Sequence, residues 1–290
     1  MSALAPLPRV PLIVCADDYG LDAGIDDGIE ALARLGRLSA VSCLASSPRW
    51  PGAARQLQAV PPWVARGLHF NLTEGVPCSP ALQRHWPRLP PLGRLMAEAH
   101  LGLLPTTLIH QELLAQLARF EQHAASAPAY IDGHQHVHHL PGVRQSVVHE
   151  ASRRRVPVRN SVPPRGGDFV IKRSLLALSG GWSMAGLLRR RGLAFNSTLV
   201  GVYDFRAPDY RALVLRWLAD VAKLPASAPA LLVCHPALPG SDAPAADPIA
   251  AARRREAAYL GSALFTRDLS AAGLRLALLG MTAYRDASVA

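Results

Sequence analysis

Short apolar runs alternate with helix-like segments along nearly the whole chain, and this alternation constrains the fold more than any other feature. Val10–Cys15 and Ala230–Cys234 are apolar and read as buried strands. Between such runs, hydrophobic residues recur at helical spacing, as at Ile25, Ile29 and Leu32. The other predicted strands are Val41–Ala45, Arg66–Leu72, a strand beginning at Tyr130, Val156–Arg159, Leu193–Val202 and Leu274–Leu279, and the predicted helices are Asp22–Leu35, Thr106–His123, Val143–Arg154, Tyr210–Val221 and Ala251–Leu260.

This order of elements predicts an α/β fold with a mainly parallel sheet. The number of strand–helix units favours a single domain over residues 1–290, built as a distorted (β/α) barrel with strands ringed by helices. A doubly wound open sheet is the alternative. The Pro-rich segment 75–105 is weakly patterned and is predicted to be an inserted loop after the third strand, and residues 284–290 are predicted to be a flexible tail.

Composition and charge narrow the class of protein. Half of the residues are hydrophobic and only 18% are charged, which excludes disorder over the whole length. The chain has no basic, apolar leader at its start and no run of about 20 apolar residues, so we expect a cytoplasmic protein with no membrane span. The four cysteines form no CxxC pair and are predicted to be free thiols, mostly buried.

The net charge of +10 is almost entirely arginine, because the chain has only two lysines, Lys172 and Lys223. The arginine clusters at 153–155, 189–191 and 253–255 fall at separate helical places. We expect them to be solvated helix ends or faces and do not expect a nucleic-acid partner.

Polar residues follow several of the predicted strands where each strand ends. Asp17 and Asp18 follow the first strand, His69 lies in the third, and His235 follows Ala230–Cys234. Two adjacent carboxylates repel, so one tends to be neutral unless a cation is bound nearby. Because α/β folds collect active-site residues at the carboxyl ends of strands, we expect these side chains to converge on one rim.

The densest polar motif is the histidine run that begins at Asp132 and ends at His139. If this stretch is extended, His134, His136 and His138 face one side. Neutral imidazole is the commonest protein ligand of metals, so the run predicts metal binding or catalysis, and spacing alone allows any of the three. The chain has no Gly-x-Ser-x-Gly elbow and no Cys with a His partner nearby in sequence, which favours metal-activated water over a Ser or Cys nucleophile.

The motifs ADDYG, GLHFNLTEG, YIDGHQHVHH and CHP, in this order, closely resemble the YdjC/ChbG/HpnK-type carbohydrate deacetylases from Val14 to about Tyr259. The resemblance implies a distorted β/α barrel that removes acetyl groups from N-acetylglucosamine-containing saccharides, such as chitin disaccharides or hopanoid-linked sugars. Two departures, Gln135 in the histidine run and Ala237 after His-Pro, affect the expected sugar specificity rather than the metal set.

Carried over by motif, the resemblance assigns roles to individual residues. It implies metal ligation by Asp18, His69 and His134, a general base at Asp17, and a general acid or transition-state stabiliser at His235. The weaker substrate-side candidates are Arg159, which could instead position the base, and Tyr19, His136, His138 and Asp204.

The expected cofactor is one divalent metal ion, magnesium or zinc, with manganese, cobalt and nickel as alternatives. The expected partner is an N-acetylated saccharide, free or lipid-linked, and a homodimer stays open. Two rival functions remain. The first is hydrolysis of another amide or ester at the same site, and the second is a non-catalytic relative that only binds saccharide or nucleic acid.

Overall fold

A computed structural model describes residues 10–162, 169–227, 229–239 and 247–277. Within these residues, seven parallel strands form one sheet in the order β4-β3-β2-β1-β6-β5, with β7 paired to the start of β1. The strands are β1 (Val10–Tyr19), β2 (Ala40–Cys43), β3 (Ala65–Phe70), β4 (Ile131–Gly133), β5 (Thr198–Val200), β6 (Ala230–Cys234) and β7 (Leu274–Leu276).

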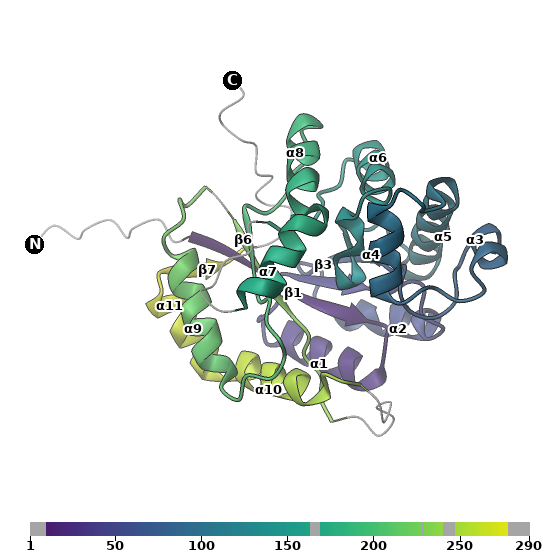
Figure 1. Cartoon of the computed structure of the whole chain (residues 1–290). Coiled ribbons are helices and arrows are strands. Elements are labelled where there is room, and N and C mark those ends of the chain that lie inside the picture. The colour runs from purple at the N-terminus through teal and green to yellow at the C-terminus, as the bar shows by residue number, and fades with distance from the viewer. Residues whose placement is uncertain (1–9, 163–168, 228, 240–246, 278–290) are drawn as a thin grey trace, which may run out of the picture.

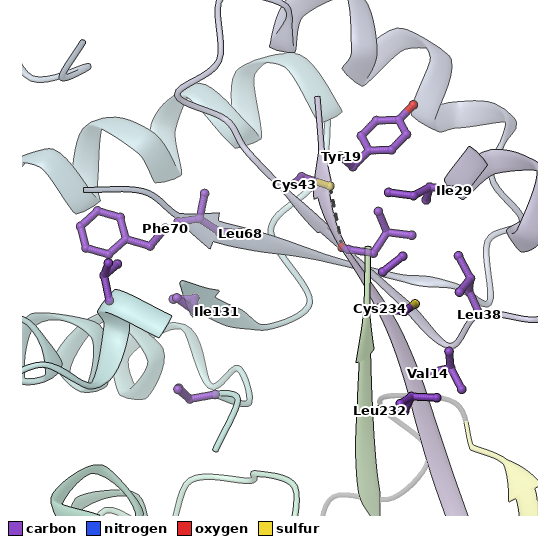
Figure 2. Packing of buried hydrophobic residues seen from close by; sticks show 14 of the residues in the cluster. Val14, Tyr19, Ile29, Leu38, Cys43, Leu68, Phe70, Ile131, Leu232 and Cys234 are labelled. Carbon is purple, nitrogen blue, oxygen red and sulfur yellow. Dashed lines mark hydrogen bonds between the residues drawn. The ribbon is translucent and has the colours of Figure 1, made fainter. Parts of the chain in front are cut away.

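Strand β1 is the centre of the sheet and of the core. It pairs with β2, β6 and β7, and all ten of its residues are buried. Val14 of β1 lies opposite Leu232 of β6, and Figure 2 shows the two side chains close together among other apolar residues. Strands covered on both faces carry near-continuous apolar sequence, which explains why the start of β1 can be predicted from the sequence.

The two edge regions of the sheet are joined by irregular chain. Val158 forms an isolated parallel bridge with Ile131 of β4, and its N–H donates to the carbonyl of Ala194 (3.1 Å). Beyond it, the Asn160 N–H donates to Asn196 Oδ1 (2.7 Å), and Asn196 Nδ2 donates back to the Asn160 carbonyl (2.8 Å). The predicted distorted barrel is confirmed as a parallel sheet curled into a half-barrel. The predicted strand Val156–Arg159 is reduced to the single bridge at Val158, and the predicted strand Leu193–Val202 to β5 (Thr198–Val200).

Helices surround the sheet (Figure 1). They are α1 (Ala23–Arg34), α2 (Trp50–Gln56), α3 (Pro80–His85), α4 (Leu92–His100), α5 (Thr106–Ala124), α6 (Arg144–Arg154), α7 (Val170–Leu176), α8 (Trp182–Arg190), α9 (Tyr210–Val221), α10 (Ala250–Gly261) and α11 (Ala263–Ala271), with shorter helical turns η1 (Leu57–Ala59), η2 (His134–His139) and η3 (Ala177–Gly181). In the part of the chain that the structure describes, none of these helices combines the length and apolar character needed to cross a bilayer.

The segment 75–105, predicted to be an inserted loop, holds the helices α3 and α4 instead. Glu112 of α5 accepts the backbone N–H groups of Cys78 and Ser79 (2.9 and 2.7 Å), which fastens the start of α3. Leu82 and Leu95 are the buried anchors of the two helices. Because each helix buries only one or two apolar residues, the pattern was too weak to predict them.

Other predictions have mixed outcomes. All four cysteines are free, and Cys15, Cys43 and Cys234 are buried as predicted. The last strand spans Leu274–Leu276, and Ala277 after it is no longer in a strand. The predicted tail 284–290 lies outside the described residues.

Candidate active site

The residues predicted to converge do so at the carboxyl ends of the strands. Asp17 and Asp18 from β1, His69 from β3, His134 after β4 and His235 after β6 all line one cavity of about 580 Å³. They come from β4, β3, β1 and β6, which lie along one continuous run of the sheet with only β2 between β3 and β1. The predicted common rim is therefore present, and the roles of its members follow from their contacts.

An irregularity in β1 brings both aspartates to the cavity. In a regular strand, neighbouring side chains point to opposite faces. Here the register with β2 shifts between Ala16 and Tyr19, and Asp18 has φ 74°, in the left-handed region. Aspartate tolerates this conformation better than most residues, and such local strain often occurs at functional sites. The shift lets Asp17 and Asp18 line the same cavity.

Asp18, His69 and His134 form a compact group of candidate metal ligands. Asp18 Oδ1 lies 3.0 Å from His134 Nδ1 and 3.6 Å from His69 Nε2. One ligand atom from each residue lies within 4.8 Å of the other two, and all three residues are buried. A carboxylate and two imidazoles at this spacing can hold one divalent ion and leave a coordination position open.

A second carboxylate sets the orientation of His69. Asp132 Oδ1 lies 2.6 Å from His69 Nδ1, while its Oδ2 accepts from Ser42 Oγ (2.6 Å) and pairs with Arg159 Nη2 (2.5 Å). This places the proton of the ring on Nδ1 and leaves Nε2 directed toward the cavity. Carboxylate–histidine pairs of this kind are typical of metal sites. Asp132 has no assigned role in the sequence prediction, although it begins the histidine motif.

The carboxylates around His69 and His134 favour positive charge on or between these rings. Burial lowers the pKa of His69, but Asp132 and Asp17 raise it more strongly, to about 10. Burial likewise lowers the pKa of His134, but hydrogen bonds with Asp18 and Glu74 raise it to about 9. Without an ion, both rings hold protons at neutral pH. A divalent cation can take the place of those protons, so the donor set fits the metal that the sequence predicts.

The sequence predicts that a bound cation reduces the repulsion between the two adjacent aspartates, and the structure shows that each carboxylate also pairs with its own arginine. Arg159 donates to both oxygens of Asp17 (Nη1–Oδ2 2.7 Å, Nη2–Oδ1 2.6 Å). Arg253 donates to Asp18 Oδ2 (2.8 Å). Burial raises the pKa of each carboxyl, but Arg159 and His69 at Asp17, and Arg253 with the two histidines at Asp18, lower both well below the ordinary value. Both carboxylates are therefore ionised at pH 7.

Arg253 corrects the prediction that the arginine clusters are solvated. It is only 4% exposed, lines the cavity, and pairs through Nε with Asp247 (2.8 Å). Its neighbour Arg254 is exposed, as predicted. The missed signal is that Arg253 and Glu256 fall on the buried face of α10 with Ala252, so charged residues interrupt a stripe that packing alone would make apolar.

His235 lines the same cavity, and among the described residues no hydrogen bond joins its ring to a carboxylate. Its Nδ1 is buried and has no hydrogen-bond partner among the described residues. The ring of Phe205 meets it edge to face, with centroids 5.3 Å apart. Burial lowers the pKa of His235 to about 4, so its imidazole is neutral at pH 7 and can both accept and pass on a proton.

The histidine run is not extended, which corrects the predicted alternation. After His134 the chain turns through η2, where Gln135 and His136 have φ of 50° and 61°. His136 still lines the cavity and lies 3.4 Å from Ser161 Oγ. His138 turns away from it, fully buried, with Nε2 3.0 Å from the carbonyl of Arg159.

The remaining substrate-side candidates, Tyr19, Asp204 and Arg159, are not among the residues that line the cavity. Tyr19 is a core residue whose hydroxyl donates to Glu30 (2.9 Å), and Figure 2 shows its ring among apolar side chains. Asp204 is exposed and caps the backbone N–H of Arg206 (2.9 Å). Arg159 is buried behind Asp17, so it can act on substrate only through that carboxylate.

The outer wall of the cavity is mostly apolar. Leu92 and Met96 come from α4, Leu140 follows η2, and Leu175 and Leu176 come from α7. Glu74, which lies 3.1 Å from His134 Nε2, adds a charged group near the metal-ligand candidates. Helices α4 and α7 thus contribute apolar lining to the cavity, while the strand ends contribute its titratable residues.

The chain shows similarity to known proteins over most of its length. The family model described as YdjC-like protein matches residues 11–271. A carbohydrate deacetylase of Mus musculus is 32% identical over 217 residues, which cover 67% of this chain and 66% of that protein. A chitooligosaccharide deacetylase of Enterobacter is 36% identical over 154 residues, covering 51% and 58% of the two chains. The chain thus spans less than two thirds of the length of these relatives.

A solved structure from Enterococcus faecalis, named as a proposed cellobiose-phosphate cleavage protein, superimposes with a TM-score of 0.75. It is 19% identical and the alignment covers 95% of this chain and 99% of that one, so it supports the fold. Together with the family match over residues 11–271, the strand-end motifs identify this chain as a member of the YdjC-like family.

Proposed function

We propose that this protein is a metal-dependent hydrolase that removes acetyl groups from N-acetylated sugars, either oligosaccharides or glycolipids. The observation that carries the proposal is the buried group of Asp18, His69 and His134 at one cavity, which Asp17 and His235 also line. The deacetylase names of the relatives support the same reaction.

Asp18, His69 and His134 would hold the ion. Two imidazoles and one carboxylate suit zinc better than magnesium, which prefers oxygen ligands, and manganese, cobalt and nickel accept the same set. When bound, a divalent ion supplies Lewis acidity that lowers the pKa of a water molecule and polarises the amide carbonyl.

The residues of the chain supply proton transfer. Asp17 is ionised, and both terminal nitrogens of Arg159 donate to its carboxylate. It accepts the proton of the attacking water. His235 delivers a proton to the nitrogen as the carbon–nitrogen bond breaks, because an amine anion is a poor leaving group. The neutral state of His235 in the free protein means that it must first receive the proton that it transfers.

The rival reaction is hydrolysis of another amide or ester by the same groups. The apolar wall of Leu92, Met96, Leu140, Leu175 and Leu176 favours substrates with an apolar portion, so glycolipids belong in any test. A non-catalytic relative would have no need for a buried base, Asp17, and a histidine, His235, at the same cavity.

Acetate release should be measured with N,N'-diacetylchitobiose, longer chitooligosaccharides, an alkyl N-acetylglucosaminide and simple acetamides. We expect release from at least one of the sugars, and its loss in Asp17→Asn. Turnover of only non-sugar amides or esters would keep the hydrolase and overturn the sugar substrate.

A further inference from the structure

Glu256 is a buried carboxyl group that the proposed chemistry does not use directly. It lies on α10 with no exposed surface, and its two oxygens have different partners. Oε2 accepts the backbone N–H of His235 (2.5 Å), and Oε1 accepts the hydroxyl of Tyr203 (2.5 Å). One side chain therefore connects the residue that follows β6 with the segment that follows β5.

The contact of Glu256 with Tyr203 is also linked, through aromatic packing, to the ring of His235. Tyr203 packs against Phe205 with centroids 4.7 Å apart, and Phe205 meets the His235 ring edge to face at 5.3 Å. Glu256 thus holds His235 at its backbone directly and at its ring through two aromatic side chains. Within the described residues no hydrogen bond reaches His235 Nδ1, so these contacts carry much of its orientation.

A buried carboxyl group is costly, and packing does not require one here. Burial raises the pKa of Glu256 to about 7, although the bonds from His235 and Tyr203 lower it. An apolar residue at this position would avoid the cost but leave the His235 N–H without an acceptor. The arrangement is therefore better explained by the need to place His235 than by stability.

We propose that Glu256 is a positioning residue that fixes His235 for proton transfer to the leaving amine. The inference rests on the proposed deacetylase function. The hydrogen bonds of Glu256 within the described residues go to His235 and Tyr203, not to Asp18, His69 or His134, so its loss should leave the candidate metal ligands in place. The expected defect is confined to the step in which the leaving group needs a proton.

The test compares two leaving groups. Glu256→Ala should lower kcat for N,N'-diacetylchitobiose by about 10- to 100-fold with little change in KM, because a small misplacement of a proton-transfer group is that costly. Its rate with p-nitrophenyl acetate should stay near that of wild type, because p-nitrophenolate leaves without a proton. Glu256→Gln, which keeps an acceptor for the His235 N–H and an amide for Tyr203, should restore most of the loss. Arg254→Gln, an exposed change on the same helix, is the matched control.

A double variant excludes a general structural defect. If Glu256 acts through His235, Glu256→Ala added to His235→Ala should cost little more than His235→Ala alone. Equal losses for amide and ester, or additive losses in the double variant, would overturn the inference. A wild-type protein that releases no acetate from any sugar would instead overturn the proposed function, so the two failures are distinguishable.

Discussion

The histidine-rich turn η2 and the strand ends beside it hold the same residue type in two opposite electrical environments. His134, like His69 of β3, faces carboxylates, and its pKa is raised to about 9. His138 and His139, only a few residues later, are hydrogen-bonded to a backbone carbonyl and a serine, and burial lowers their pKa values to about 3 and about 4. His139 instead pairs with Ser179 Oγ (2.9 Å).

The contrast teaches that nearby carboxylates, and not the number of histidines, determine which rings are candidate metal ligands. A histidine ring hydrogen-bonded to Asp18 or Asp132 either stays protonated or would give up its proton to bind a metal ion. Near a backbone carbonyl or a serine, the ring stays neutral and serves packing. A sequence with many histidines can therefore hold one metal site and one structural turn.

The largest effect should separate the two groups of histidines. His134→Ala removes a ligand candidate, so we expect metal affinity to fall by more than about 100-fold and acetate release to become undetectable. His138→Gln should leave metal affinity almost unchanged. Metal titration of both purified variants checks this, and an equal loss in the two would contradict the division.

The next largest effect should come from the base. Asp17→Asn keeps the shape of the side chain but removes its charge, so we expect kcat to fall by about 100- to 10,000-fold. Metal should still bind, because Asp17 is not among the three ligand candidates. Steady-state kinetics with metal analysis of the same sample tests this. A variant that retains the wild-type rate would remove Asp17 from the mechanism.

A smaller effect should follow when the orientation of His69 is disturbed. Asp132→Asn weakens the 2.6 Å contact with Nδ1, and we expect metal affinity to fall by about 10- to 100-fold. Asp204→Asn, at an exposed position, is the control. Competitive chelation curves give both affinities, and unchanged affinity in Asp132→Asn would show that this carboxylate is only structural.

The smallest effect concerns stability in acid. The folded pKa of His139 is about 4, below the ordinary value of about 6.5. The unfolded chain therefore binds the extra proton first, and stability is lost as pH falls from about 6.5 toward 4. At pH 5 this costs about 2 kcal/mol. His139→Gln should flatten the fall in unfolding free energy between pH 7 and 5, measured by denaturant titration, and the exposed His149→Gln should not.

The sequence predicted the parts of the molecule that depend on simple periodicity. Buried parallel strands read as apolar runs: β6 matches its predicted bounds, and β1 begins at the predicted Val10 but continues past the predicted end at Cys15 to Tyr19. The gathering of Asp17, His69 and His235 follows from the rule that strand ends share one rim. These features need no knowledge of tertiary contacts.

The features that the sequence missed depend on local conformation or on distant partners. The shift at Asp18 and the left-handed residues Gln135 and His136 change which side chains face the cavity, and no period encodes them. Arg253 and Asp132 find their partners more than 60 residues away, so their roles appear only when the strands and α10 come together.

The most direct test of the account is a metal titration of chelator-stripped protein in which bound metal and acetate release from N,N'-diacetylchitobiose are measured in the same samples. The account predicts no release from stripped protein and release that rises in proportion to metal until one ion is bound per chain. Full release from the stripped protein would contradict it.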